Sequence, residues 1–313
     1  MTDVLTGDPM AWRLPDHVGT AVAIGVFDGV HRGHRTVLDR MVALADEHGW
    51  TPTALTFDPH PLEVVAPERA PRRLSSVGQR IAALSAAGME IVGVLAFETI
   101  REMDADTFGT DVLAHRLRAR LVAIGSDFRF GHDRSGTVET LRRAGVDAGY
   151  DVMAVDLVSE NGSTPISSTR IRSLLAAGDV EGAAVLLGHR YELSGLVVEG
   201  DKRGRSLGFP TANLAVDDRV AIPGDGVYAA WALIHEEPHL AVVNIGVRPT
   251  FDGRRRCIEA HLLDFDGDLY GRGMALRFVA RLRGEQKFAG IDDLVSQIQT
   301  DVNQARAALE GDR

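Results

Sequence analysis

The sequence has very little cysteine and no long hydrophobic run. Cys257 is the only cysteine among 313 residues, so the chain cannot form an internal disulfide, which suits a reducing cytoplasm. No stretch approaches the roughly 20 apolar residues of a membrane-spanning helix. Residues 1–4 lack the basic and apolar regions of a secretory signal. We therefore expect a cytoplasmic protein without a membrane partner.

Positive charge is also in the minority. The formal net charge is −10, and non-specific nucleic-acid binding depends on Lys and Arg neutralising phosphates, so we expect no nucleic-acid partner. A nucleotide site remains compatible, because a few cations can gather in a cleft of an acidic protein. The Walker A order Gly-x-x-x-x-Gly-Lys-Ser/Thr is absent. The partners we expect are small molecules, and the sequence leaves open whether the chain is a monomer or a homo-oligomer.

Strand-like and helix-like segments alternate in the first half of the chain. Short apolar runs occur at 21–27, 53–57, 91–97, 121–124 and 151–155. Between them lie helical patterns near 36–48, 77–87, 106–118 and 138–149. This alternation predicts a parallel sheet covered on both faces, with ligands beyond the carboxyl ends of its strands.

The pattern changes after a helical stretch over 168–187, which Gly188 should end. Further strand-like runs occur at 191–198, 227–234, 240–245, 257–263 and 275–282. Turn residues separate these runs and no helix lies between them, which predicts an antiparallel barrel or sandwich. A final helix is expected from 291 to about 309. The predicted domains are residues 1–187 and residues 188–313.

The most informative motif is at residues 25–34, which read Gly-Val-Phe-Asp-Gly-Val-His-Arg-Gly-His directly after an apolar run. Its two histidines, three apart at a strand-to-helix turn, should lie on one side of the first helical turn. Unpaired amide N–H groups and the helix dipole favour an anion there. His31 and His34 add donors that can follow charge onto phosphate oxygens. The alternative is that both histidines merely fill a turn.

A second motif covers residues 200–213, Gly-Asp-Lys-Arg-Gly-Arg-Ser-Leu-Gly-Phe-Pro-Thr-Ala-Asn. Its glycines allow close backbone approach and its cations supply positive charge: Gly200, Gly204, Gly208, Lys202, Arg203 and Arg205. Thr211, with Asn213 nearby, offers oxygen ligands for a hydrated Mg²⁺ between nucleotide phosphates. On composition alone, an exposed basic hairpin turn is an alternative.

Both motifs resemble known signatures. Residues 25–34 are similar to the Gly-x-Phe-Asp-x-x-His-x-Gly-His signature of the nucleotidyltransferase superfamily, and Gly-Phe-Pro-Thr-Ala-Asn at 208–213 resembles that of riboflavin kinases. Further strings resemble the kinase at 244–251, 258–265, 269–271 and 281–283, and the first domain at 56–61, 125–131 and 166–172. From about residue 20 to 305 the chain resembles the bacterial bifunctional riboflavin kinase/FAD synthetase family.

The resemblance implies an N-terminal Rossmann-like nucleotidyltransferase domain and a C-terminal antiparallel β-barrel kinase domain with a terminal helix. Such an enzyme phosphorylates riboflavin to FMN with ATP, and then transfers AMP from ATP to FMN, giving FAD and pyrophosphate. Mg²⁺ is the implied cofactor, while riboflavin, FMN and FAD are substrates or products.

The residue roles also follow from the resemblance. A primary alcohol is a poor nucleophile and needs a base, and Glu259 is the implied one. The phosphate of FMN is already anionic, so the histidines are expected to stabilise charge. The implied ATP-binding residues are Gly25, Phe27, Asp28, His31, His34, Ser168, Thr169, Arg172, Gly200, Lys202, Gly204, Arg205, Gly208, Thr211 and Asn213, the last two also binding metal. The implied flavin-binding residues are Asp58, His60, Asp127, Phe128, Phe130 and Arg281.

Simpler interpretations stay open for single residues. Glu259 alone reads as a solvated strand charge, and residues 167–172 alone as a helix cap with surface arginines. Residues 58–61 could form only a rigid turn, and Phe128 and Phe130 could belong to the core. Asp127 stands where some relatives carry Asn, and Thr137 stands where Asp is expected.

Two other functions compete with the leading one. One is an enzyme with a single activity and one degenerate domain, against which the intact motifs of both halves argue. The other is a flavin-binding regulator, against which the acidic charge, the lack of a DNA-binding motif and the retained Glu259 and histidines argue.

Overall fold

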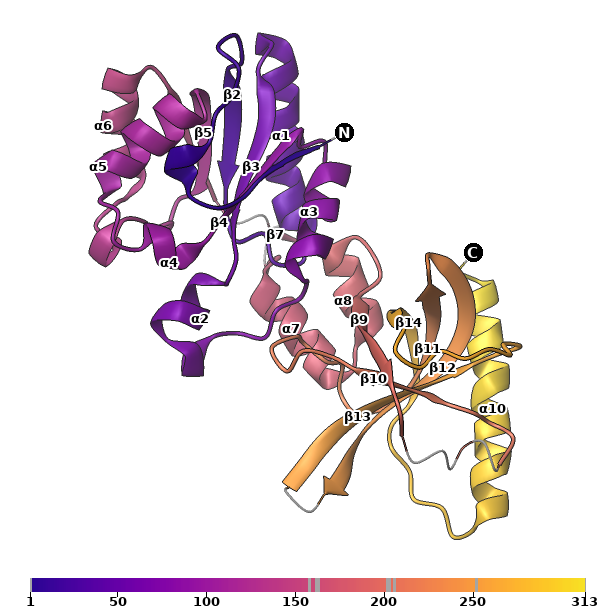
Figure 1. Cartoon of the computed structure of the whole chain (residues 1–313). Helices are drawn as coiled ribbons and strands as arrows, with labels where there is room; N and C mark the ends of the chain where they lie inside the picture. Colours follow the sequence, from indigo (N-terminus) through magenta and orange to yellow (C-terminus); the bar gives the residue numbers. More distant parts are fainter. Residues whose placement is uncertain are drawn as a thin grey trace. The chain divides into compact units, whose positions relative to one another are not determined.

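The fold is described from a computed structural model that places residues 2–156, 159–160, 164–200, 204, 207–250 and 253–312 (Figure 1). The chain forms two compact units. Unit 1 is Met1–Pro71 with Ser75–Ser167, and unit 2 is Arg72–Leu74 with Ser168–Arg313. The predicted domains 1–187 and 188–313 differ from these units mainly in residues 168–187, which pack with the second unit. The boundary between the two expected activities stays a prediction.

Unit 1 contains a sheet of six parallel strands, which confirms the predicted α/β class. The strand order is β1-β4-β3-β2-β5-β6. The strands are β1 (Asp3–Leu5), β2 (Thr20–Ile24), β3 (Thr51–Phe57), β4 (Ile91–Leu95), β5 (Ala119–Gly125) and β6 (Asp151–Val155). Every residue of the central strand β2 is buried, as expected of a parallel strand that is covered on both faces.

Two hydrophobic clusters cover the two faces of this sheet. Val22 and Ile24 belong to one cluster, whereas Ala21 and Ala23 belong to the other, because successive strand residues point to opposite faces. The helices of the unit are α1 (Arg32–His48), α2 (Pro61–Val65), α3 (Val77–Ala86), α4 (Phe97–Ile100), α5 (Ala105–Thr107) and α6 (Val138–Ala148). Short turns of helix lie at Pro9–Ala11, Pro67–Arg69 and His132–Arg134, and β7 (Ser159–Glu160) pairs with β8 (Thr164–Pro165).

Two helix predictions in this unit need correction. The helix expected from residue 36 begins at Arg32, one turn earlier, because the side chain of His31 caps it. The helix expected over 106–118 is a short α5 followed by a π-helical segment, Phe108–Arg116. The first of these corrections places His34 inside the first turn of α1.

Unit 2 contains a closed antiparallel barrel, which decides between barrel and sandwich. The order around it is β10-β13-β12-β11-β14-β9, and these strands are labelled in Figure 1. The strands are β9 (Glu192–Val198), β10 (Ala212–Ala215), β11 (Gly226–Ile234), β12 (Glu237–Thr250), β13 (Gly253–Leu262) and β14 (Gly273–Arg283). The predicted terminal helix is α10 (Ile291–Glu310), which packs Val302, Ala305 and Leu309 onto the barrel.

The helical stretch predicted over 168–187 is two helices, α7 (Ser168–Ala177) and α8 (Val180–Leu187). The break falls at Gly178, whose φ of 82° is left-handed, and Asp179 then caps α8. Among the described residues, no helix combines the length and the apolar character needed to cross a bilayer.

Candidate functional site

The first candidate site is the turn between β2 and α1, at the carboxyl end of the sheet. Phe27, Gly29 and Val30 have φ angles of 51°, 81° and 38°, so this turn is built from left-handed backbone. The Nδ1 atom of His31 accepts the backbone N–H of His34 at 3.3 Å and so caps α1. The turn therefore presents both histidines at a helix N-terminus, where an anion is favoured.

The two imidazole rings are stacked. Their centroids lie 3.7 Å apart with an interplanar angle of 13°, and the edge of Phe27 meets the ring of His34 at 5.3 Å. A Cβ atom added at Gly33 would come within 3.2 Å of the His31 ring, so a side chain there would crowd the stack. Because Nδ1 of His31 accepts a hydrogen bond, neutral His31 carries its proton on Nε2, which is then a donor.

His34 is uncharged at neutral pH. Burial of its ring lowers the pKa of His34 well below 6.5, and the charges of His31 and Arg80 lower this pKa further. Its Nδ1 atom is buried without a hydrogen-bond partner among the described residues. The unfolded chain thus binds this proton more readily than the folded chain, so stability is lost as the pH falls below about 6.5. His34 therefore offers an N–H donor without a positive charge of its own.

A buried polar network lies beneath this turn. Asp28 is 3% exposed, and one carboxylate oxygen accepts the N–H of Ser75 at 3.2 Å. The hydroxyl oxygen of Ser75 accepts the N–H of Gly29 at 3.1 Å. Arg80, 1% exposed, donates to the carbonyl of Phe57 at 2.7 Å. Asp28 therefore holds the turn from inside, and its predicted contact with ATP stays a prediction.

The remaining residues predicted in unit 1 lie around the same sheet edge. The N–H of Gly25 donates to Leu55 at 3.1 Å, and Asp58 directly follows β3, where it is joined to Pro59 by a cis peptide bond. The Nδ1 atom of His60 accepts the N–H of Leu62 at 3.1 Å and caps α2. Asp58 and His60 are both partly exposed, so their predicted contact with flavin is compatible with this placement.

The loop after β5 separates its three predicted residues. Asp127 is exposed and Phe128 partly buried, whereas Phe130 is buried in the core against Phe108. The rings of Phe128 and Phe130 are stacked with centroids 6.0 Å apart. Packing thus accounts for Phe130 without a ligand, and of the two aromatics only Phe128 has a partly exposed ring.

Ser168, Thr169 and Arg172 lie in unit 2, in the first half of α7. Ser168 is the first residue of the helix, so the predicted helix opening is present. The Nε atom of Arg172 donates to the carbonyl of Arg72 at 2.7 Å. Arg172 is thus bonded within unit 2, and phosphate binding by Ser168, Thr169 and Arg172 stays a prediction.

The second candidate site is a cavity of about 640 Å³ on the barrel. Glu259 lies on β13 directly between Asn213 of β10 and Asn244 of β12, which are its register partners on the two neighbouring strands. Thr211, Asn244, Glu259 and His261 belong to the polar wall, and Phe288, Leu294 and Ile298 belong to the apolar wall. The site therefore combines three carboxylates (Glu259, Glu285 and Asp301), two cations (Arg283 and Lys287), neutral polar neighbours and an apolar surface.

The sequence did not indicate a buried ion pair in the same cavity. Arg283 donates from Nη2 to Asp301 at 2.8 Å and from Nε to both of its oxygens at 3.0 and 3.1 Å. Gln297 donates to the same carboxylate at 2.9 Å. Asp301 is 2% exposed, and the guanidinium lies 5.7 Å from the ring centroid of Phe288. The pair anchors α10 to β14 beside the apolar wall.

Replacing Asp301 by Asn should destabilise unit 2 by about 2 kcal/mol, because it leaves the mostly buried Arg283 without its counter-charge. The measurement is urea unfolding followed by circular dichroism. Asp264→Asn is the matched control, since its ion pair with Arg306 is exposed and should contribute under about 1 kcal/mol. Equal effects of the two substitutions would show that burial does not strengthen the Asp301 pair.

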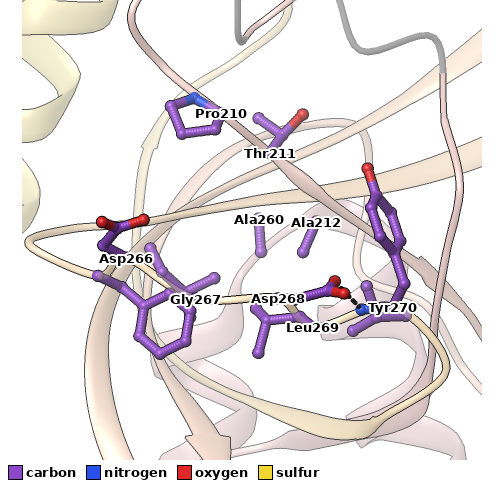
Figure 2. Close-up of a pocket in the computed structure, with 12 residues that line it drawn as sticks. Pro210, Thr211, Ala212, Ala260, Asp266, Gly267, Asp268, Leu269 and Tyr270 are labelled. Atoms are coloured by element: carbon purple, nitrogen blue, oxygen red, sulfur yellow. Dashed lines mark hydrogen bonds between the residues drawn. The ribbon is translucent and has the colours of Figure 1, made fainter.

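A second barrel cavity of about 610 Å³ lies beside the first (Figure 2). Figure 2 shows Pro210 and Thr211 on one side and the loop of Asp266–Tyr270 on the other. A carboxylate oxygen of Asp268 accepts the N–H of Tyr270 at 3.0 Å. Thr211 lines both cavities, so a group bound at Thr211 reaches the cavity of Glu259.

The glycines of the second motif lie close to its other residues. A Cβ at Gly200 would fall 2.2 Å from the Asn213 amide, and one at Gly204 would fall 2.3 Å from the carbonyl of Phe209. Gly208 has a φ of 86°. Each of these glycines thus fits a crowded or left-handed position, and the close approach of their backbone to a phosphate stays a prediction. Lys202, Arg203 and Arg205 lie outside the described residues.

Arg281, predicted to bind flavin, lines neither of these two cavities. Its guanidinium donates to the carbonyls of Ala177 at 3.1 Å and Asp225 at 2.8 Å. These bonds tie the end of α7 to the barrel. Arg283 on the same strand does line the first cavity, and flavin binding by Arg281 stays a prediction.

These two sites, one at the edge of a parallel α/β sheet and one in a cavity on a closed barrel, are places where enzymes of such folds commonly bind ligands. A family profile for FAD synthetase matches residues 14–170, and one for riboflavin kinase matches residues 187–309. The chain belongs to the family of bifunctional riboflavin kinase/FMN adenylyltransferases.

Individual relatives agree with this assignment. The bifunctional riboflavin kinase/FMN adenylyltransferase of Escherichia coli K12 is 40% identical over 290 residues, which is 92% of each chain. The Bacillus subtilis 168 relative of the same name is 36% identical over 91% of each chain. A crystal structure from Streptococcus pneumoniae, described as a macrolide-efflux protein, shares the fold with a TM-score of 0.85 and 29% identity, over 97% of this chain and 98% of that one.

Proposed function

We propose that this chain makes FAD from riboflavin in two steps, at two separate sites. It phosphorylates riboflavin to FMN with ATP, and it then joins FMN to AMP from a second ATP. The observation that carries the proposal is the placement of Glu259 between Asn213 and Asn244 in a cavity that also reaches Thr211. That is the arrangement a kinase acting on an alcohol requires.

In the kinase step, Glu259 takes the proton of the ribityl hydroxyl. The oxygen of that hydroxyl attacks the γ-phosphorus of ATP, and ADP leaves. Asn213 and Asn244 are uncharged, so they can orient the carboxylate without pairing with it as ions. The apolar wall, including Phe288, Leu294 and Ile298, offers a surface for the isoalloxazine ring. The base and the ring surface thus belong to one cavity.

ATP for this step is assigned to the neighbouring cavity. The phosphates of ATP should lie toward Thr211, because Asp266 and Asp268 on the other side of the cavity would repel them. The nucleoside end then lies against Leu269 and Tyr270. Since Thr211 lines both cavities, this orientation brings the γ-phosphate toward Glu259.

In the adenylyl step, a phosphate oxygen of FMN attacks the α-phosphorus of ATP and pyrophosphate leaves. This nucleophile carries no proton that must be removed, so alignment and charge stabilisation suffice. His31 and His34 supply N–H donors at the N-terminus of α1, where the helix dipole adds to their effect. We place this activity in residues 1–187, so that the domain includes Ser168, Thr169 and Arg172.

Mg²⁺ is the metal that fits Thr211 and Asn213. Both offer neutral oxygens, and the described residues hold no cluster of three or more His, Cys, Asp or Glu side chains for a protein-only metal site. An ion held mainly by nucleotide phosphates and water, with one or two protein oxygens, matches this donor set. When bound, Mg²⁺ neutralises phosphate charge.

Replacing Thr211 by Ala should raise the KM for MgATP in riboflavin phosphorylation about tenfold, because one charge-assisted oxygen contact is lost. Initial rates measured against magnesium and ATP concentration check this. Thr211→Ser keeps the hydroxyl and should stay near the original values. An unchanged KM in Thr211→Ala would remove Thr211 from the nucleotide site.

The whole proposal is tested by incubating the purified chain with riboflavin and MgATP and separating the flavins by chromatography. FMN should appear first and FAD later, with ADP and pyrophosphate as co-products. FMN without FAD would leave a kinase with a degenerate first domain. Flavin bound but unchanged would identify a flavin-binding protein without either activity.

A further inference from the structure

Arg80 is a fully buried cation next to the histidine turn. It lies in α3, whose first turn is fixed by the capping box of Ser76 and Gln79, and it is only 1% exposed. Burying a guanidinium is costly unless its donors are bonded, and an apolar side chain of similar size would often be as stable. A role in filling space alone would therefore not require an arginine here.

The donors of Arg80 lead to the turn. Its Nη1 atom donates to the carbonyl of Phe57 at 2.7 Å and to the hydroxyl oxygen of Thr56 at 3.0 Å. The hydroxyl of Thr56 donates in turn to the carbonyl of Val26 at 2.9 Å. Val26 precedes Phe27, the left-handed residue whose ring meets His34. Two successive hydrogen bonds thus connect Arg80 to the backbone that positions His34.

Arg80 also acts on His34 through its charge. The groups whose charge lowers the pKa of His34 are His31, from the same turn, and Arg80, from α3. Asp28, in the same turn, faces Ser75 and accepts its N–H, and the uncharged ring of Phe27 packs against His34. A proton added to His34 on Nδ1 would be buried without an acceptor among the described residues.

We propose that Arg80 is a positioning residue for adenylyl transfer, which fixes the Val26–Phe27 turn through Thr56 and so sets how His34 meets a phosphate oxygen. The proposal rests on the proposed function of the first site. In that reaction the oxygen–phosphorus bond to FMN forms as the bond to pyrophosphate breaks, and no proton is taken from the nucleophile. An uncharged His34 that donates one N–H suits this step, and Arg80 maintains that state.

The experiment uses the full chain with FMN and MgATP, so that the kinase step is bypassed. FAD formation is measured from about pH 5.5 to about pH 8.5 for three variants. In Arg80→Gln the acid limb of the rate profile should move to higher pH, with about a tenfold larger loss at pH 6 than at pH 8. Arg80→Lys keeps the charge, so it should keep the acid limb and recover part of the rate.

Thr56→Val is the matched variant for the hydrogen-bond path. It removes the hydroxyl that joins Arg80 to Val26 but leaves the charge of Arg80 in place. We expect a lower rate, of about tenfold, with the acid limb unmoved. Riboflavin phosphorylation in the same samples reports that the chain is folded, and it should stay within about twofold, because Arg80 and Thr56 lie in the other unit.

Three results would overturn the proposal. One is an equal loss at every pH in Arg80→Gln with no recovery in Arg80→Lys, which would make Arg80 purely structural. Another is an unchanged rate and profile in Arg80→Gln. The third is an NMR titration in which His34 has the same pKa in Arg80→Gln as in the wild-type chain. This result would show that the charge of Arg80 does not act on His34, and it can be obtained even if the wild-type chain makes no FAD. Absence of FAD with a shifted titration would contradict the proposed function alone.

Discussion

Replacing Glu259 by Gln should reduce riboflavin phosphorylation by about a thousandfold, while FAD formation from supplied FMN continues. A general base contributes about 10²–10⁴ to such a transfer, and glutamine cannot accept the proton of the ribityl hydroxyl. The substitution keeps the size of the side chain between Asn213 and Asn244. Separate initial-rate assays with riboflavin and with FMN measure the two effects.

The matched control for this variant is Glu237→Gln, which changes an exposed glutamate at the start of β12 in the same barrel. It should keep both activities. If Glu259→Gln also kept full kinase activity, the proton would leave the hydroxyl by another route. Glu259 would then be a solvated strand charge, as its residue type alone allows.

Replacing His34 by Gln or His31 by Asn should have the opposite effect, with a loss of about 10²–10³ in FAD formation from FMN. Each variant removes one imidazole donor from the phosphate site. Asn at position 31 still provides a side-chain oxygen to cap α1, so the helix start is retained. The measurement is FAD formation from FMN and MgATP, with riboflavin phosphorylation followed in parallel.

His48→Asn is the matched control for the histidine variants, because His48 lies at the other end of the same helix and is exposed. It should leave both activities unchanged. Unaltered FAD formation in both histidine variants would mean that the stacked pair only fills the turn. Loss of kinase activity along with FAD formation would contradict two separate sites.

The parallel sheet could be predicted because its strands are apolar throughout and bounded by turns, as the fully buried β2 illustrates. The strands β1 and β10 were not predicted, because segments of three and four residues are too short to show the hydrophobic periodicity of a strand. The sequence also could not distinguish a barrel from a sandwich, because the short strand β10 was not predicted. Its closure depends on the pairing of β10 with β9 and β13, which sequence spacing does not reveal.

The histidine turn and the strand position of Glu259 could be predicted because each lies in a specific motif, and the register of β13 then placed Glu259 between two asparagines. The roles of these residues stay predictions. Arg80 and Asp301 could not be predicted, because each lies within the apolar stripe of an amphipathic helix and belongs to no motif. A charge at such a position is a usable signal, since buried charges need partners. Ile298, Asp301 and Ala305 on α10 show this pattern.

Isotope transfer from ATP tests the central claim, that one chain performs both a phosphoryl and an adenylyl transfer. The wild-type chain is given riboflavin with ATP labelled either at the γ-phosphate or at the α-phosphate. Both labels should enter FAD in equal molar amounts, while FMN carries only the γ label. FAD that lacks the γ label, or FMN that carries the α label, would contradict the account.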